Sequence, residues 1–394
     1  GQVKKAARSV LRARRAVLYV GGGVIAADGA AELLELAELT RIPVTTTLMA
    51  LGAFPSDHAL SLGMLGMHGG YAANMAVYNS DCLIAVGARF DDRVTGKVEQ
   101  FAPQAEIIHV DIDPSSISKN IKVHIPIVGD ARRVLARLIE ALREEGAGQS
   151  QSAIREAREQ WLRQIAQWQQ KHPFRYDWDD ELIKPQYVVE EIAHLTRGEA
   201  VIVTGVGQHQ MWAAQFSRFR HPRHWLTSGG LGTMGYGLPA AIGAQVARPD
   251  RLVVLVDGDG SFVMNSQELA TVVENQLPVK VVIVNNGGHG MVRQWQDVIY
   301  GGRFQSIDLS ASPDFVKLAE AYGAVGIRAS KPNEVVPALE RAFAEPGPVV
   351  VDVMVDRDEL CFPMVPAGGA NKDMILERPN KDVKAKAAKV QTGF

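Results

Sequence analysis

Short apolar, β-branched runs alternate with helix-length segments along the chain, and this alternation occurs twice. The runs that we expect to be strands are 16–20, 42–47, 81–87 and 106–113 in the first series and 200–205, 252–260, 279–286 and 347–355 in the second. Strands that alternate with helices favour parallel sheets with helices on both faces. The pattern therefore predicts an α/β protein with two doubly wound, mainly parallel-sheet, Rossmann-like domains.

The stretch between the two series has a different composition. Its apolar content is low, it is rich in Gly, Pro and charge, and it contains one amphipathic helix with Trp161 and Trp168. Such composition is typical of a linker. We predict a first domain at 1–145, a helical linker at 146–184, a second domain at 185–375 and a C-terminal tail at 376–394.

Composition and charge narrow the classes of function. The chain has 394 residues, of which 46% are hydrophobic, and a net charge of −2, which gives no electrostatic footprint for nucleic acid or an anionic membrane. No apolar run approaches the ~18 residues of a membrane span. Two cysteines, Cys82 and Cys361, exclude a disulfide framework and favour a reducing compartment, either the bacterial cytoplasm or an organelle's stroma or matrix. We expect small-molecule chemistry.

Polar residues follow two strands in the run 252–286. The first strand stops at Gly258-Asp259-Gly260 and the second stops at Asn285-Asn286. Either motif alone also suits a simple turn after a strand. The glycines let a backbone approach a ligand closely, and a helix N-terminus that follows a strand favours a diphosphate.

The segment between these strands predicts a crossover helix. Asn265 followed by Glu268 is a capping-box-like start, so we expect a helix at 266–275. A right-handed crossover brings the carboxyl ends of two parallel strands to the same edge of the sheet. Asp259 and Asn286 should then face one crevice, where carboxylate and amide oxygens suit Mg²⁺ that is shared with a substrate's phosphates.

The spacing of these two motifs resembles the cofactor motif of thiamine diphosphate enzymes. The segments 63–77, 87–97, 206–216, 229–244, 290–296 and 362–375 are more specifically similar to the catalytic subunit of acetohydroxyacid synthases. The resemblance covers essentially the whole chain. It implies a carboligase of branched-chain amino-acid biosynthesis that condenses pyruvate with a second 2-ketoacid, pyruvate or 2-ketobutyrate, and releases CO₂. It further implies thiamine diphosphate, Mg²⁺ and FAD as cofactors, a homodimer or tetramer, and room for a regulatory small subunit.

The resemblance also assigns roles in the second domain. Asp259, Asn286 and a backbone carbonyl near Gly288 would bind Mg²⁺, and Met234 would lie beneath the cofactor and hold its two rings in a bent conformation. The other expected contacts of thiamine diphosphate are Val206, Gly207, Gln208, His209, Gly232, Gly258, Gly260, Ser261, Gly290 and Met291. The alternative for Met234 is a core residue. Gly287-Gly288 departs from the family pattern, and we expect a floppier loop there.

The resemblance gives two further side chains a role in substrate specificity. Arg93 offers a planar fork for the carboxylate of the second ketoacid, although an ion pair with Asp91 or Asp92 is an alternative. Trp295 is an apolar wall that would favour an ethyl over a methyl group on the acceptor. Together with Met234 and Met291, these residues are the expected catalytic and specificity set.

The first domain resembles the FAD-binding middle domain of the family. Gly21-Gly22-Gly23 follows the strand at 16–20 and opens a helix, which is a place for a dinucleotide phosphate. The resemblance adds as flavin or adenosine contacts Thr47, Leu48, Met49, Met67, His68, Gly87, Arg89, Asp91, Arg93, Asp111, Ile112 and Asp130. The flavin would be structural, because carboligation transfers no net electrons. For His68, satisfaction by local hydrogen bonds is the alternative.

The family also has an N-terminal domain that carries a glutamate which protonates the aminopyrimidine ring. The sequence begins at Gly1, without Met, and holds no counterpart of that domain, so we expect folding without turnover. Alternatives are a glyoxylate carboligase, a pyruvate oxidase-like enzyme and a non-catalytic cofactor-binding partner half. A two-domain NAD dehydrogenase is a fourth, but no GxGxxG motif occurs.

Overall fold

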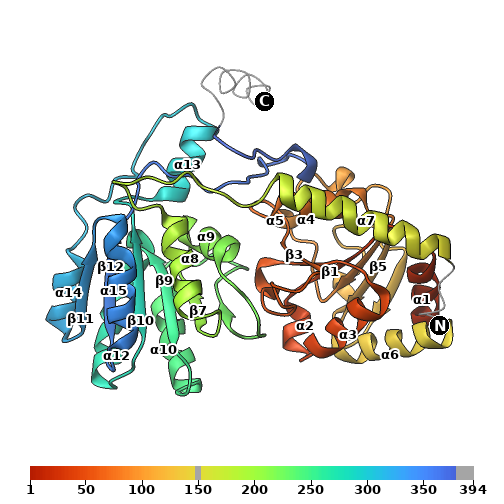
Figure 1. The fold of residues 1–394 in the computed structure, drawn as a ribbon, viewed down its shortest axis with the longest axis horizontal. Coiled ribbons are helices and arrows are strands. Elements are labelled where there is room, and N and C mark those ends of the chain that lie inside the picture. Colours follow the sequence, from red (N-terminus) through yellow and green to blue (C-terminus); the bar gives the residue numbers. More distant parts are fainter. Residues whose placement is uncertain (147–151, 379–394) are drawn as a thin grey trace. The chain divides into compact units, whose positions relative to one another are not determined.

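The computed structural model describes residues 1–146 and 152–378, which form two compact units (Figure 1). Unit 1 comprises Gly1–Phe174, Phe219–Arg223 and Pro363–Leu376, and unit 2 comprises Arg175–Arg218, His224–Phe362 and the described residues from Glu377 onward. Each unit contains one six-stranded sheet in which the strand pairs are parallel. The prediction of two doubly wound α/β domains is confirmed.

The sheet of unit 1 has the strand order of dinucleotide-binding folds, β3-β2-β1-β4-β5-β6. Its strands are β1 Ala16–Val20, β2 Val44–Thr46, β3 Ser61–Met64, β4 Cys82–Val86, β5 Glu106–Asp111 and β6 Ile125–Val128. Side chains alternate between two cores, as in β1, where Leu18 packs in one core and Tyr19 in the other. The strand order reverses between β1 and β4, and ligands of such sheets bind outside the carboxyl ends at this point.

Helices cover both faces of this sheet. One core includes residues of α1 Gln2–Arg12, α2 Gly22–Ala26, α3 Ala30–Thr40 and α6 Ala131–Glu144, and the other includes residues of α4 Tyr71–Asn79, α5 Asp92–Thr95 and α7 Ser152–Lys171. The 3₁₀ segments of the unit are η1 Leu48–Ala50, η2 Val98–Gln100, η3 Pro114–Ser116 and η5 Asn371–Asp373. The strands are continuous apolar runs because the sheet is buried on both faces.

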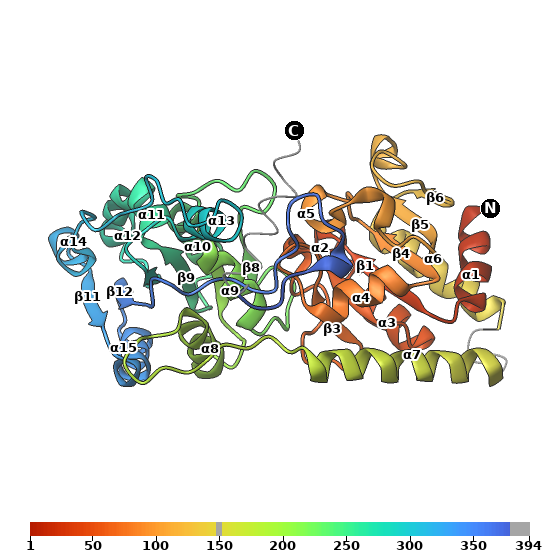
Figure 2. The ribbon, with the colours of Figure 1, turned by 90° about the horizontal axis from the view of Figure 1, so that it is seen from above.

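The helix of the predicted linker is part of unit 1. α7 lies along α4 (Figure 2), and it buries Trp161 and Ile165 in the shared core. Arg158 is also buried, and its guanidinium donates to backbone carbonyls at the ends of α1 and α3, namely those of Val10, Ala13 and Thr40. The division therefore differs from the predicted linker at 146–184, because the apolar face of this helix has a core to cover.

Unit 2 has the strand order β11-β12-β10-β9-β7-β8. Its strands are β7 Val201–Thr204, β8 Trp225–Leu226, β9 Val253–Gly258, β10 Lys280–Asn285, β11 Val325–Ala329 and β12 Val349–Met354. Each of the eight expected runs contains a strand. The sequence pattern did not predict β3, β6, β8 and β11, which are short or are interrupted by glycine and polar residues.

The helices of unit 2 are α8 Pro185–Leu195, α9 Gln208–Phe216, α10 Gly237–Ala247, α11 Asp259–Phe262, α12 Leu269–Glu274, α13 Gly290–Val298, α14 Phe315–Tyr322 and α15 Pro332–Ala344, with the 3₁₀ segment η4 Val263–Glu268. The predicted capping box at Asn265 is wrong. Asn265 Nδ2 donates to the Gly235 carbonyl at 2.9 Å, and the chain forms η4 before the regular helix begins at Leu269. Among the described residues, no helix is long and apolar enough to cross a membrane.

Candidate functional site

A pocket in unit 2 lies at the carboxyl ends of β7, β9 and β10. Here the strand order reverses, because β8 lies on one side of β7 and β9 on the other. The lining residues are Val206, Gly207, Gln208, His209, Trp212, Met234, Gly258, Asp259, Gly260, Ser261, Val284, Asn286, Gly288, His289, Gly290, Met291 and Val292. The structure thus brings together the residues that the sequence assigned to the thiamine and metal sites, with Gly232 outside the lining.

Asp259 is the most distinctive group in this pocket. It follows the fully buried strand β9, is itself 2% exposed, and its Oδ2 has no hydrogen-bond partner among the described residues. Burial raises the pKa of the Asp259 carboxyl to about 6, which the N–H groups of Gly260 and Gly288 oppose. A buried carboxylate with an unsatisfied oxygen is costly unless it is paired or binds a metal. This oxygen fits a cation.

Asn286 lies beside Asp259 because β9 and β10 are parallel neighbours. Its Oδ1 accepts from the Gly288 N–H at 3.1 Å, and the same N–H interacts with the Asp259 carboxylate, so both side chains converge on Gly288. The turn favours glycine at 287, where φ is 64°. No group of three or more His, Cys, Asp or Glu within the described ranges could hold a metal, so an ion here would depend on amide, backbone and phosphate oxygens, as Mg²⁺ does.

The loop with Gly287-Gly288 is held on one side, contrary to the expected floppiness. The N–H of His289 donates to the Ile307 carbonyl at 2.9 Å, and the N–H of Leu309 donates to the Gly287 carbonyl at 3.0 Å. Gly288 and Asp308 form an antiparallel bridge between these bonds. The segment 307–309 therefore supports the loop that carries Asn286.

Two side chains at the start of α9 explain glycines elsewhere in the pocket. His209 Nε2 lies 3.2 Å from Oδ1 of the buried Asp257, and a Cβ at position 258 would lie 2.7 Å from His209 Nδ1. A Cβ at position 290 would lie 2.0 Å from Gln208 Oε1. These glycines are required because the imidazole and the carboxamide occupy the space beside them.

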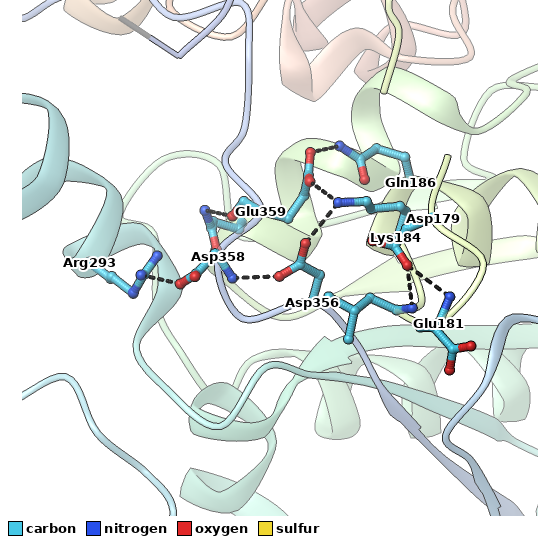
Figure 3. A network of polar contacts seen from close by, with 10 residues as sticks. Asp179, Glu181, Lys184, Gln186, Arg293, Asp356, Asp358 and Glu359 are labelled. Atoms are coloured by element: carbon cyan, nitrogen blue, oxygen red, sulfur yellow. Dashed lines mark hydrogen bonds and ion pairs between the residues drawn. The ribbon is translucent and has the colours of Figure 1, made fainter. Parts of the chain in front are cut away.

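Gln208 is held by α13 and by the segment after β12. Its Nε2 donates to Gln294 Oε1 at 2.9 Å and to the Glu359 carbonyl at 3.2 Å. Figure 3 shows the polar network around Glu359, in which Lys184 Nζ bonds to Asp356 at 2.7 Å and to Glu359 at 3.0 Å. This mostly buried network fixes the backbone that accepts from Gln208.

The turn before α10 brings Met234 to the pocket. The N–H of Gly235 and the N–H of Val206 both donate to Ser261 Oγ, at 3.1 and 3.3 Å. Ser261 thus ties this turn to the end of β7, and Met234 lines the pocket from there. Gly232 lies earlier on the same loop, with φ at 67°.

The specificity residues lie in different places. Met291 lines the pocket at the start of α13, whereas the half-buried Trp295, one turn later on the same helix face, does not line it. Arg93 belongs to unit 1, where its exposed guanidinium lies 3.6 Å from Asp92 Oδ2. The Arg93 side chain helps to line a small pocket with Met67 and residues 365–368.

The expected flavin residues of unit 1 follow strand ends at one edge of its sheet. Gly21 to Gly23 follow β1, Thr47 to Met49 follow β2, Met67 and His68 follow β3, Gly87, Arg89, Asp91 and Arg93 follow β4, Asp111 and Ile112 lie at the end of β5, and Asp130 follows β6. A Cβ at position 21 would lie 2.1 Å from the Gly87 carbonyl oxygen. The glycines therefore allow the ends of β1 and β4 to approach where the strand order reverses.

Several of these polar side chains have local partners. Asp91 and Asp130 are N-caps, which accept from the N–H groups of Arg93 at 3.2 Å and Arg133 at 3.0 Å. His68 is buried, with Nδ1 3.1 Å from the Pro363 carbonyl, and burial lowers its pKa to about 4. Ile112, by contrast, is 72% exposed, an apolar surface at the edge where a dinucleotide would bind.

The sequence reading missed four lining residues, Trp212, Val284, His289 and Val292. Trp212 lies one turn after Gln208 and His209, so helical spacing was a signal for it. His289 stands three residues after Asn286 in the loop, and a Cβ at position 260 would lie 2.9 Å from its Nδ1. The proximity of an imidazole to the central glycines depends on tertiary packing, which the spacing does not reveal.

Comparison with known proteins agrees with this geometry. Residues 3–138 match the central domain of thiamine pyrophosphate enzymes, and residues 205–353 match their C-terminal TPP binding domain. The chain is 48% identical over 384 residues to the acetolactate synthase isozyme 3 large subunit of Escherichia coli, which covers 97% of this chain and 66% of that protein. It is 47% identical over 383 residues to the acetolactate synthase large subunit of Haemophilus influenzae, in an alignment that covers 97% of this chain and 66% of that protein. It is 49% identical over 384 residues to the acetolactate synthase of Mycobacterium bovis, in an alignment that covers 96% of this chain and 61% of that protein.

Proposed function

The chain belongs to the thiamine pyrophosphate enzyme family, and from this we infer that it supplies the central and diphosphate-binding parts of an acetolactate synthase catalytic subunit. The chain spans 61 to 66% of the length of the relatives described above. The whole protein would condense pyruvate with pyruvate or 2-ketobutyrate and release CO₂, in branched-chain amino-acid biosynthesis. The match of both halves to this family leaves a two-domain NAD dehydrogenase without support.

The observation that carries this proposal is the buried, unsatisfied Oδ2 of Asp259 beside Asn286. We assign Mg²⁺ to Asp259, Asn286 and the backbone carbonyl of Gly288. Gly207, Gln208 and His209, at the start of α9, would hold the diphosphate through backbone N–H groups and polar side chains. The Ser261 hydroxyl would keep the end of β7 and the turn before α10 in place around it.

When bound, thiamine diphosphate supplies the nucleophilic carbon and the electron sink for decarboxylation of a 2-ketoacid. The residues of this chain would orient and shield it. Met234 would support the bent arrangement of its two rings, since a long, unbranched and polarizable side chain adapts to such a surface. Met291 would cover the reacting part from α13 and exclude water.

Recognition of the second ketoacid would use Arg93 and Trp295. A guanidinium binds a carboxylate through two parallel hydrogen bonds, and the indole would distinguish an ethyl from a methyl group, a difference worth ~1–3 kcal/mol. The Arg93 guanidinium is exposed, and its ion pair with Asp92 is long at 3.6 Å. Such a pair is weak, so it would not prevent the guanidinium from binding a substrate carboxylate.

FAD would bind at the carboxyl edge of the unit 1 sheet, near the order reversal at β1 and β4. The exposed Ile112 and Met49 at this edge offer apolar surface for its rings. The relatives named above as large subunits suggest a small regulatory subunit as a partner. The resemblance to the family suggests a homo-oligomer. A reducing cytoplasm agrees with both cysteines being free.

The test is a product assay on two samples, both with Mg²⁺, thiamine diphosphate, FAD and pyruvate. We expect the 394-residue chain alone to make no acetolactate, and the same chain joined to the N-terminal domain of a relative to make it. Failure of the joined protein would refute the proposed function. Robust product from the chain alone would instead show that the catalytic acid lies within these residues. Glyoxylate as substrate and oxygen consumption separate the glyoxylate carboligase and pyruvate oxidase alternatives.

A further inference from the structure

A second cavity in unit 2 is separate from the pocket at Asp259. Its volume is about 540 Å³, within the range of small-molecule sites. It is lined by Arg293, Phe304, Gln305, Ser306, Ile307, Asp308, Arg357 and Asp358. None of these residues has a role in the proposed function, so the two arginines beside an aromatic ring require another explanation.

Arg293 is the most buried charged group of this cavity. Its side chain is only 13% exposed and pairs through Nη2 with Asp358, toward which it points in Figure 3. The guanidinium carbon lies 5.0 Å from the centre of the Phe304 ring. Nη1 is buried and has no hydrogen-bond partner among the residues that the structure describes. A desolvated donor without an acceptor is unfavourable, and an incoming acceptor would relieve it.

The two carboxylates of the cavity are largely exposed to water. Arg357 Nη2 bonds to Asp308 Oδ1 at 2.7 Å, and the side chains of Asp308 and Asp358 are 59% and 63% exposed. Ion pairs with such exposed carboxylates contribute little, because water screens them. A ligand carboxylate that also contacts the half-exposed ring of Phe304 gains apolar contact that the aspartates lack.

We propose that this cavity binds a small organic carboxylate, which replaces Asp358 on Arg293 and places its apolar or planar part on Phe304. Arg293 and the ligand would form a bidentate pair in which Nη1 gains its missing acceptor. Arg357 adds a second positive charge on the same cavity.

The cavity wall is joined to the loop of the first pocket. Ile307 and Leu309 form backbone hydrogen bonds with His289 and Gly287. A Cβ at position 288 would lie 3.9 Å from Arg357 Nη2, so that guanidinium borders the loop directly. A ligand that orders residues 304–308 therefore also stabilises 287–289. An effect of this ordering on Mg²⁺ affinity rests on the proposed function, whereas the ordering itself does not.

The binding test uses the full chain without Mg²⁺ or thiamine diphosphate and benzoate as the probe in isothermal titration calorimetry. We expect Arg293→Met to weaken benzoate at least about tenfold, as loss of a bidentate charged pair should. Asp358→Asn should tighten it about threefold, because the competing carboxylate is gone. Benzamide, the neutral analogue, should bind at least about tenfold more weakly than benzoate. Arg341→Met, at an exposed position on α15, is the matched control and should leave binding unchanged.

Three results would overturn the proposal. They are equal binding of benzoate and benzamide, no gain in the Asp358→Asn variant, and inorganic phosphate binding as tightly as benzoate with no effect of Phe304→Ala. The gain in Asp358→Asn keeps the test decisive even where Arg293→Met fails to fold. Coupling is tested by hydrogen exchange of peptides that cover 286–309, which benzoate should slow. Unchanged exchange there would refute the coupling. Because no cofactor is present, failure of the thiamine assignment leaves these outcomes unaffected.

Discussion

Both sheets carry glycine and acidic residues at the carboxyl ends of their strands, but these residues have different partners in the two units. At the edge of unit 1, Gly21 packs on Gly87, and Asp91 and Asp130 cap helices. At the edge of unit 2, the glycines 258 and 290 make room for His209 and Gln208, and Asp259 keeps a buried oxygen without a partner.

The difference shows which features of a strand end indicate a ligand. Glycines and capping aspartates are explained by the backbone of their own unit, with or without a bound dinucleotide. A buried carboxylate oxygen that no donor reaches has no such explanation, because its desolvation is not compensated. The case for a cofactor is thus stronger in unit 2 than in unit 1, and four substitutions test that contrast.

The largest expected effect is at Asp259. Asp259→Ala removes the formal negative charge of the proposed ligand set, so we expect Mg²⁺-dependent affinity for thiamine diphosphate to fall at least about 100-fold. Calorimetric titration of thiamine diphosphate with and without Mg²⁺ measures it. Asp250→Ala, on an exposed turn of the same unit, is the control. Unchanged affinity in Asp259→Ala would remove the metal assignment and with it the contrast between the units.

The glycines of unit 1 should show a structural effect instead. Gly21→Ala would place a methyl group 2.1 Å from the Gly87 carbonyl oxygen, and overpacking of this kind typically costs ~1–3 kcal/mol in the free energy of unfolding. Urea denaturation without FAD measures it. The matched control is Gly22→Ala, whose methyl group would lie no closer than 3.3 Å to its nearest neighbour, Met49 Cβ, so only a small adjustment is needed. Equal stability of the two variants would contradict the packing explanation.

A buried histidine gives unit 1 a pH dependence. Burial, assisted by Arg93 and opposed by the Pro363 carbonyl, lowers the pKa of His68 to about 4, whereas in the unfolded chain it is ~6.5. As pH falls below 6.5 the unfolded state binds a proton that the folded state does not, so stability is lost until the pH passes the folded pKa. Between pH 7 and 5 this amounts to about 2 kcal/mol.

The measurement is urea denaturation at pH 7 and pH 5 for the unsubstituted chain and for His68→Gln. On acidification from pH 7 to pH 5, the variant should lose about 2 kcal/mol less of its free energy of unfolding than the unsubstituted chain loses, because glutamine takes up no proton. The same loss in both proteins would show that His68 is not buried in its neutral form.

The smallest effect concerns Trp295. In the complete enzyme, Trp295→Leu should lower the preference for 2-ketobutyrate over pyruvate as acceptor about tenfold, the scale of one apolar contact. Decarboxylation of pyruvate should be spared. Competition between the two ketoacids, with both products quantified, measures the ratio. An unaltered ratio would assign Trp295, which does not line the pocket, to packing alone.

Much of the fold was predictable from the sequence, because strands buried on both faces read as continuous apolar runs. β1, β4, β9 and β10 are of this kind. β8 has two residues, and Gly326 and Arg328 interrupt the apolar residues of β11, so neither has a hydrophobic pattern long enough to recognise. Asn265 follows the capping pattern in sequence, but it bonds to Gly235, which only the folded chain brings near.

The candidate site was predictable to the extent that residues follow strand ends in a fixed spacing. Asp259 and Asn286 are such residues, and crossover geometry brings them together. Trp212 follows Gln208 and His209 by one turn of α9, so helical spacing was a signal for it. His289, in the loop before α13, enters the pocket through tertiary packing, which the spacing of the motifs does not encode. The unsatisfied oxygen of Asp259 is likewise a property of its surroundings, since the same Gly-Asp-Gly string could form a solvated turn.

The discontinuity of unit 1 has a consequence for synthesis on the ribosome. Its β-sheet ends at residue 128, yet the unit also needs Phe219–Arg223 and Pro363–Leu376. From the last of these segments, the N–H of Val365 donates to the Met67 carbonyl, and Asn371 Nδ2 donates to the Val94 carbonyl. Chains emerge from the ribosome N-terminus first, at ~5–20 residues per second. Unit 1, whose sheet precedes that of unit 2 in the chain, is therefore completed only when nearly all of the described chain has emerged, and its edge near Met67 stays uncovered in the nascent protein for ~10 seconds or more.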